Sequence, residues 1–116
     1  MRDLIIIGEL QVWPRDLGEM TWDEAMVEVT KLGPGWRLPT LDEFKETLYP
    51  GRSGILGLAD DDYWSNTKYY ANYSAWYFNF SNGQFHYTSN KNPTFYVLAV
   101  RDFGGETALE ILLKDF

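Results

Sequence analysis

The stretch from Gly35 to Thr40, Gly-Trp-Arg-Leu-Pro-Thr, constrains the fold of this 116-residue chain more than any other feature of its sequence. Pro34 cannot continue a helix, so a helix predicted over residues 21–32 must end just before this stretch. Thr40 is followed three residues later by a glutamate, and this pair is typical of the capping box that starts a second helix, predicted over residues 41–49. The stretch is therefore a joint between two helices.

The side chains of the joint alternate between two environments. In an extended segment, Trp36 and Leu38 point to one side and Arg37 points to the other. We expect Trp36 to anchor the core, Thr40 to cap the second helix, and Arg37 to pair with carboxylates or carbonyls. The alternative is that Arg37 faces a pocket and holds an anion.

One or two short strands are predicted before the first helix. Residues 4–7 are apolar and mostly β-branched, which indicates a buried strand. Gly8 permits a bend, and the alternation that starts at Leu10 indicates a second strand or a continuation of the first. Thr21 and Glu24 then have the spacing of the capping box that starts the first helix.

The Asn82-Gly83 pair is the strongest hairpin signal in the chain, because both central residues of a type I′ turn need a positive φ. A two-residue turn predicts the cross-strand pairs Phe80–Phe85, Phe78–Tyr87 and Trp76–Ser89. One face of the hairpin would then be aromatic, with Trp76, Phe78, Phe80, Phe85 and Tyr87. The other face would be more polar, with Tyr77, His86 opposite Asn79, and Thr88.

A central strand and a tail are predicted near the C-terminus. Residues 95–100 are apolar on both faces, as in a strand that is covered on both sides, and Arg101 ends this strand. Gly104 and Gly105 then interrupt the predicted regular structure. Residues 1–103 are predicted to form one domain and residues 104–116 a tail, for which a helix is favoured over an alternating strand. The predicted class is α+β, with two short helices over an aromatic-lined antiparallel hairpin.

Composition excludes several classes of function. The net charge of −7 argues against nucleic acid and anionic membranes, because both need a cationic surface on the protein. The absence of cysteine excludes thiol chemistry. The apolar run at residues 4–7 is too short for a signal peptide or a membrane span. The sequence as written indicates a cytoplasmic protein, and a secreted or surface protein if a leader has been removed.

Few residues could support metal binding or catalysis. Asp60, Asp61 and Asp62 could form a calcium site, but a solvated turn is favoured because metal ligands need spacing rather than adjacency. His86 is the single histidine, and no nucleophile motif accompanies it. We therefore predict no metal site, no cofactor and no enzyme activity, and the sequence leaves open whether Asp60–Asp62 bind calcium.

Several motifs, taken in order, resemble one known family. They are Thr21-Trp22-Asp23-Glu24-Ala25, the run from Gly35 to Phe44, Tyr63-Trp64-Ser65-Asn66-Thr67, Ala75-Trp76-Tyr77, Phe80-Ser81-Asn82-Gly83 and Val100-Arg101. This succession, over about residues 12–103, resembles the Lcl C-terminal domain family, which is named after a bacterial collagen-like adhesin. The resemblance implies a C-type-lectin-like fold, in which two helices flank twisted antiparallel sheets and the chain ends lie close together. Formylglycine-generating enzymes and phage receptor-binding variable proteins are similar in fold.

The resemblance also implies where a ligand binds. In C-type-lectin-like folds the recognition surface lies beside a loop that here carries three tyrosines, and tyrosine offers a large contact area at low entropic cost. The predicted ligand-binding residues are Tyr69, Tyr70, Tyr73, Tyr77, His86 and Lys91. The predicted structural residues are Trp36, Arg37, Thr40, Trp64, Trp76 and Arg101. The ligand would be a protein or a carbohydrate, unless these tyrosines simply cover the sheet.

Two other functions are compatible with the sequence. The apolar tail could assemble copies of the chain into a homo-oligomer, because exposed apolar patches usually mark interfaces. The chain could also be a degenerate relative of formylglycine-generating enzymes that lacks activity.

Overall fold

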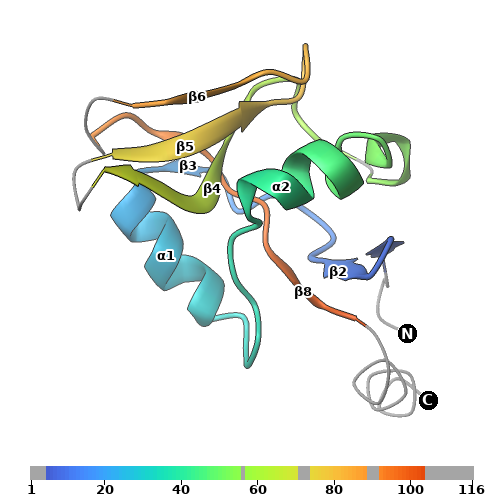
Figure 1. Cartoon of the computed structure of the whole chain (residues 1–116). Coiled ribbons are helices and arrows are strands. Elements are labelled where there is room, and N and C mark those ends of the chain that lie inside the picture. Colours follow the sequence, from blue (N-terminus) through green and yellow to red (C-terminus); the bar gives the residue numbers. More distant parts are fainter. Residues whose placement is uncertain (1–4, 56, 71–73, 89–91, 104–116) are drawn as a thin grey trace.

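Helices and two β-sheets combine in an α+β arrangement, as predicted (Figure 1). The computed structural model describes residues 5–55, 57–70, 74–88 and 92–103. The predicted tail at residues 104–116 therefore lies outside the described residues. Among the described residues, no helix is long and apolar enough to cross a membrane.

The elements follow one another closely along the chain. The strands are β1 (Ile5–Ile7), β2 (Leu10–Val12), β3 (Glu19–Met20), β4 (Asp62–Tyr70), β5 (Ser74–Asn79), β6 (Phe85–Tyr87), β7 (Phe95–Tyr96) and β8 (Val100–Asp102). The helices are α1 (Trp22–Thr30), α2 (Leu41–Glu43), the π-helix η1 (Phe44–Leu48) and the 3₁₀-helix η2 (Arg52–Gly54).

The smaller sheet joins the two ends of the described chain. Its order is β1-β2-β8, with both pairs antiparallel and Val12 opposite Val100. Gly8, with a φ of 60°, forms the turn between β1 and β2. The first predicted strand is therefore present, but its residues are only partly buried because β1 is an edge strand.

The larger sheet has the order β3-β7-β4-β5-β6. Its pairs are antiparallel except for β4 and β7, which run parallel and place Tyr63 opposite Tyr96. Figure 1 shows β6 along the outer edge of this sheet and α1 beneath it. The sheet is therefore mixed, whereas the sequence predicted antiparallel pairing throughout.

Helix α1 begins and ends where its local signals place it. Thr21 and Glu24 form the predicted capping box, in which each side chain accepts a hydrogen bond from the other residue's backbone N–H. The helix ends at Thr30, two residues earlier than predicted, and Gly33 follows with a φ of 128°. One face is buried and includes the Trp22 indole, which donates a hydrogen bond to the Ser65 carbonyl at 2.9 Å.

The second predicted helix starts as expected and then widens. Thr40 and Glu43 form the predicted capping box, but the α-helical hydrogen bonding continues only to the end of α2. From Phe44 the helix is a π-helix, in which the Tyr49 N–H donates to the Phe44 carbonyl at 2.9 Å. The wider turn lets both of these rings pack on Phe78, with centroid distances of 5.3 and 5.5 Å.

The single central strand predicted over residues 95–100 is wrong. The structure divides this stretch between β7 in one sheet and β8 in the other, and Val97, Leu98 and Ala99 cross between them fully buried. The backbone of this crossing accepts hydrogen bonds from the N–H groups of Leu17 and Trp13, each at 2.9 Å. Its apolar character thus comes from burial between the sheets rather than from a central position in one of them.

The hairpin register differs from the prediction by two residues. The observed pairs are Trp76–Tyr87, Tyr77–His86 and Phe78–Phe85. Phe80 leaves the ladder because its ring enters the core and its N–H donates to the Asp61 carbonyl at 3.0 Å. The loop is consequently longer than two residues. A shift of two keeps every side chain on its predicted face, but His86 lies opposite Tyr77 and not opposite Asn79.

Candidate binding surface

The β5–β6 hairpin carries the most exposed aromatic surface in the part of the chain that the structure describes. Trp76, Phe85 and Tyr87 share one face of the hairpin, and we call these three residues the aromatic ridge. The Trp76 ring packs edge-on against Phe85 at 5.8 Å and against Tyr87 at 5.2 Å. Phe85 is 38% exposed and Tyr87 is 49% exposed. The ridge is thus a connected apolar surface rather than isolated side chains.

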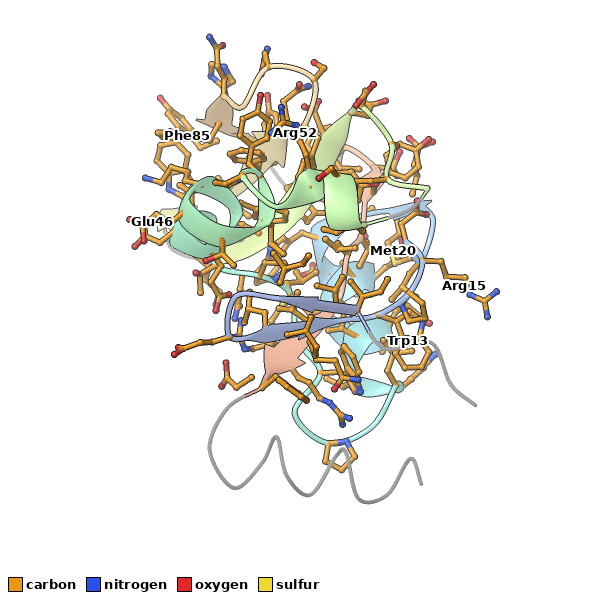
Figure 2. All side chains as sticks on the ribbon, turned by 90° about the vertical axis from the view of Figure 1, so that its right-hand side faces the viewer. Trp13, Arg15, Met20, Glu46, Arg52 and Phe85 are labelled. Atoms are coloured by element: carbon orange, nitrogen blue, oxygen red, sulfur yellow. The ribbon has the colours of Figure 1, made fainter. Side chains whose placement is uncertain are left out.

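Helix η1 borders the ridge with charged groups. The Lys45 ammonium lies over the Phe85 ring, 4.7 Å from its centroid, and is 3.5 Å from a carboxylate oxygen of Asp42. In Figure 2, Phe85 and Glu46 lie on one flank of the molecule, and Met20, Arg15 and Trp13 lie on the opposite flank. A partner on the ridge would therefore meet aromatic carbon with charges of both signs beside it.

The other face of the hairpin holds two of the predicted ligand-binding residues. Tyr77 and His86 are directly opposite each other, with ring centroids 6.1 Å apart. The Tyr77 ring also packs on Phe95 at 4.5 Å, and Phe95 packs on the buried Trp64 at 4.6 Å. Burial, followed by the charge of Asp62, raises the pKa of the Tyr77 hydroxyl. Tyr77 therefore connects the core to His86, which is exposed.

The other predicted ligand-binding residues are only partly placed. Tyr69 and Tyr70 are the last two residues of β4, and the structure describes their backbone but not their side chains. Tyr73 and Lys91 lie outside the described residues. The structure thus brings Tyr77 and His86 together and leaves the rest of the predicted set as a prediction.

The joint places its aromatic residue inside and its cation between carboxylates. Trp36 is 7% exposed. The Arg37 guanidinium donates two hydrogen bonds to the Glu43 carboxylate, at 2.7 and 2.8 Å, and a third to Asp102 at 2.9 Å. These bonds, above all those with Glu43, hold the pKa of Arg37 above its ordinary value. Arg37 therefore binds the chain's own carboxylates in the way predicted for a structural arginine.

The remaining predicted structural residues also pack against other elements. Trp64 is fully buried, and its indole N–H donates to the Met20 carbonyl at 2.8 Å. The Arg101 Nε–H donates to the Gln11 side chain at 2.6 Å, and the Arg101 guanidinium lies over the Trp36 ring. Thr40 caps the second helix.

Two hollows lie away from the hairpin. One, of about 530 Å³, is formed by Gly8, Glu9, Leu10, Glu43, Thr47, Asp102 and Phe103. The other, of about 490 Å³, lies between β3 and α1 and is lined by Met20, Asp23, Glu24, Val27 and Glu28. Among the described residues, no group of three or more histidine or carboxylate side chains could hold a metal ion.

The sequence did not identify Phe85 and Tyr87 as exposed residues. It assigned both to the aromatic face of the hairpin and made no prediction of their exposure. The missing signal was topological, since β6 is the outermost strand of the larger sheet and the core covers the same face only as far as Phe78.

Comparison with known proteins supports the resemblance read from the motifs. The model of the Lcl C-terminal domain matches residues 10–101, which include both sheets except for β1 and the end of β8. No curated protein matches the sequence. The chain belongs to the Lcl C-terminal domain family.

Proposed function

We propose that the chain is a non-catalytic binding module that recognises a protein partner through the aromatic ridge. The observation that carries this proposal is the exposure of Phe85 and Tyr87 on one short strand, beside Trp76. Aromatic residues are enriched at the centres of protein interfaces, and contiguous exposed apolar surface usually marks an interaction site.

The chemistry of the ridge favours a protein over a carbohydrate. Its rings pack edge-on rather than presenting one flat platform, and the Lys45 ammonium already lies over one side of the Phe85 ring. An apolar side chain of a protein can pack between such rings without polar contacts.

The absence of catalysis is part of the proposal. His86 faces Tyr77, and the Tyr77 ring is packed on Phe95. A general base needs a reacting group within hydrogen-bond reach, and among the described residues this pair of rings makes no such arrangement with a nucleophile. We also infer the C-type-lectin-like fold for this chain, and the pairing of β2 with both β1 and β8 supports it.

Matched surface variants test the proposal. The full chain is used as a probe on an array of purified proteins and on an array of glycans, together with the double variant Phe85→Ser, Tyr87→Ser. Val27→Ser is the control, because Val27 is 54% exposed on α1, away from the ridge. We expect protein ligands whose affinity falls at least about tenfold for the double variant and stays unchanged for the control.

Two outcomes would contradict the proposal. Glycan ligands that depend on Phe85 and Tyr87 would show that the partner class is wrong. Protein ligands that bind the double variant as tightly as the original chain would show that the ridge is not the site.

A further inference from the structure

The hydrogen bonds of the hairpin show which backbone groups of β6 face outward. The Asn79 N–H donates to the Gln84 carbonyl at 2.8 Å, and the Thr88 N–H donates to the Ala75 carbonyl at 3.1 Å. In an antiparallel pair, hydrogen-bonded positions alternate with positions that make no bond to the neighbouring strand. Residues 84, 86 and 88 therefore direct their backbone groups toward β5.

Phe85 occupies the alternate position. It lies opposite Phe78 in the observed register, so its N–H and C=O point away from β5, toward the outer edge of the sheet. No strand lies beyond β6 among the residues that the structure describes. The same residue thus offers an aromatic ring on one face and a donor and an acceptor along the edge.

The edge of β6 lacks the charged and proline residues that often protect an edge strand, and its short length of three residues is its one protection of this kind among the described residues. Natural edge strands commonly carry lysine, other charged residues or proline. Residues 84–88 read Gln-Phe-His-Tyr-Thr and contain none of these. On its aromatic face the strand is flanked by Lys45, whose ammonium lies over the Phe85 ring.

We propose that the partner protein adds an extended segment to the outer edge of β6, as a further strand of the larger sheet. This inference rests on the proposed function, because it specifies how a partner engages the same ridge. Side chains of an added strand alternate between the two faces of the sheet. The segment therefore carries apolar residues at alternate positions, which pack beside Phe85, and polar residues between them, on the face of His86.

A partner is favoured over a second copy of this chain by charge. Each copy carries a net charge of −7, so two copies repel each other as they approach. A short extended segment of another protein avoids that penalty if the segment is neutral or basic. Self-association through β6 is therefore an outcome of the test and not the expectation.

Comparing Phe85→Pro with Phe85→Ala distinguishes the contribution of the strand edge to binding from that of the aromatic ring. Random ten-residue peptides displayed on phage are selected against the immobilised full chain, and the selected peptides are measured by fluorescence polarisation. Phe85→Ala removes the ring and keeps the N–H, whereas Phe85→Pro removes both, and proline is tolerated on an edge strand where the N–H faces outward. We expect selected peptides with alternating apolar residues, whose affinity for Phe85→Pro is at least about fivefold lower than for Phe85→Ala.

The outcomes distinguish the two proposals. If Phe85→Ala and Phe85→Pro lose affinity equally, the ridge binds the peptide but strand addition is wrong. If neither variant loses affinity, the ridge itself is wrong. Selected peptides with helical spacing of apolar residues, or no selected peptides, would overturn strand addition. A dimer of the original chain in sedimentation that Phe85→Pro dissociates would overturn the choice of a partner protein.

If the Phe85→Pro variant folds poorly for reasons unrelated to binding, a melting temperature below that of Phe85→Ala will reveal this. A second measurement then tests strand addition without that variant. The selected peptide is N-methylated at one residue at a time and measured against the original chain. Strand addition predicts that affinity falls at every second residue, because only those N–H groups face β6. An equal effect at consecutive residues would overturn it.

Discussion

The guanidinium of Arg101 lies over the indole of Trp36, with 4.7 Å between its central carbon and the ring centroid. Trp36 also contacts Trp13, and the two rings pack edge-on with their centroids 5.1 Å apart. Arg101 belongs to β8 and also donates a hydrogen bond to Gln11 of β2. Strand β8 thus connects the joint between the helices to β2, near the N-terminus.

Replacing Trp36 with alanine tests how much this contact contributes to stability. Trp36→Ala should lower the free energy of unfolding by about 3–5 kcal/mol, because it leaves a cavity among Trp13, Arg101 and the buried face of α1. Urea denaturation monitored by circular dichroism measures the loss. A loss below about 1 kcal/mol would mean that Trp36 does not anchor the core.

The ion pair of Arg37 with Glu43 predicts a pH-dependent loss of stability in acid. Burial raises the pKa of Glu43, but the hydrogen bonds from Arg37 and Thr40 outweigh it and bring the pKa below its ordinary value of 4.5. The resulting stabilisation is complete above pH 4.5, where Glu43 is ionised in both states, and is lost as the pH falls through the folded pKa.

Glu43→Gln isolates this charge because glutamine can still accept the capping hydrogen bond from the Thr40 N–H. At pH 7 the variant should be about 1–2 kcal/mol less stable than the original chain, since the pair is only partly buried. At pH 3 the difference should be much smaller. Equal differences at both pH values, measured by urea unfolding, would show that the ion pair does not stabilise the fold.

Two glycines with similar backbones make a matched pair for the hairpin loop. Gly83 and Gly57 have φ values of 74° and 77°, so alanine is strained at either position. A Cβ at Gly83 would lie 2.7 Å from the Tyr49 ring, whereas a Cβ at Gly57 would meet nothing within 4 Å. Gly57→Ala should therefore cost about 1 kcal/mol, and Gly83→Ala about 2–4 kcal/mol because the collision adds to the strain.

Thermal unfolding of the two alanine variants checks this difference. The loss of stability for Gly83→Ala should exceed that for Gly57→Ala. Equal losses would indicate that the loop can move away from Tyr49 without cost.

Tyr63 predicts a loss of stability in alkali. Burial is the largest of the causes that raise the pKa of the Tyr63 hydroxyl from 10.0 to about 12. Between these values the unfolded chain releases a proton that the folded chain retains, so stability falls as the pH rises. Tyr63→Phe should reduce the fall between pH 9 and pH 11 by about 1 kcal/mol relative to the original chain. An unchanged fall in urea unfolding would contradict the assignment.

Local features of the fold were predictable because their determinants lie within a few residues. Thr21 with Glu24 and Thr40 with Glu43 form the two capping boxes that the sequence indicates. The burial of Trp36 likewise follows from the alternation within the joint. The α+β class then follows from two capped helices and an Asn-Gly hairpin in one short chain.

Features that depend on distant partners were not predictable in the same way. Phe80 shifts the hairpin register because it finds a place among Phe44, Tyr63 and Phe78, and no pattern within the hairpin encodes that contact. The third hydrogen bond of Arg37 goes to Asp102, 65 residues away. Such contacts require the topology, which short-range periodicity does not contain.

At the candidate binding surface, too, only the locally determined features were predictable. The pleat of the hairpin correctly assigned Tyr77 and His86 to one face and Phe85 and Tyr87 to the other. It did not show that Phe85 and Tyr87 reach solvent, because exposure depends on the position of β6 at the edge of the larger sheet.

Hydrogen–deuterium exchange of the full chain, alone and in complex with a protein partner from the array, tests the central claim most directly. Binding through the aromatic ridge predicts slower amide exchange in residues 84–88 and unchanged exchange in α1, which lies beneath the sheet (Figure 1). Slower exchange confined to α1, with residues 84–88 unchanged, would contradict it.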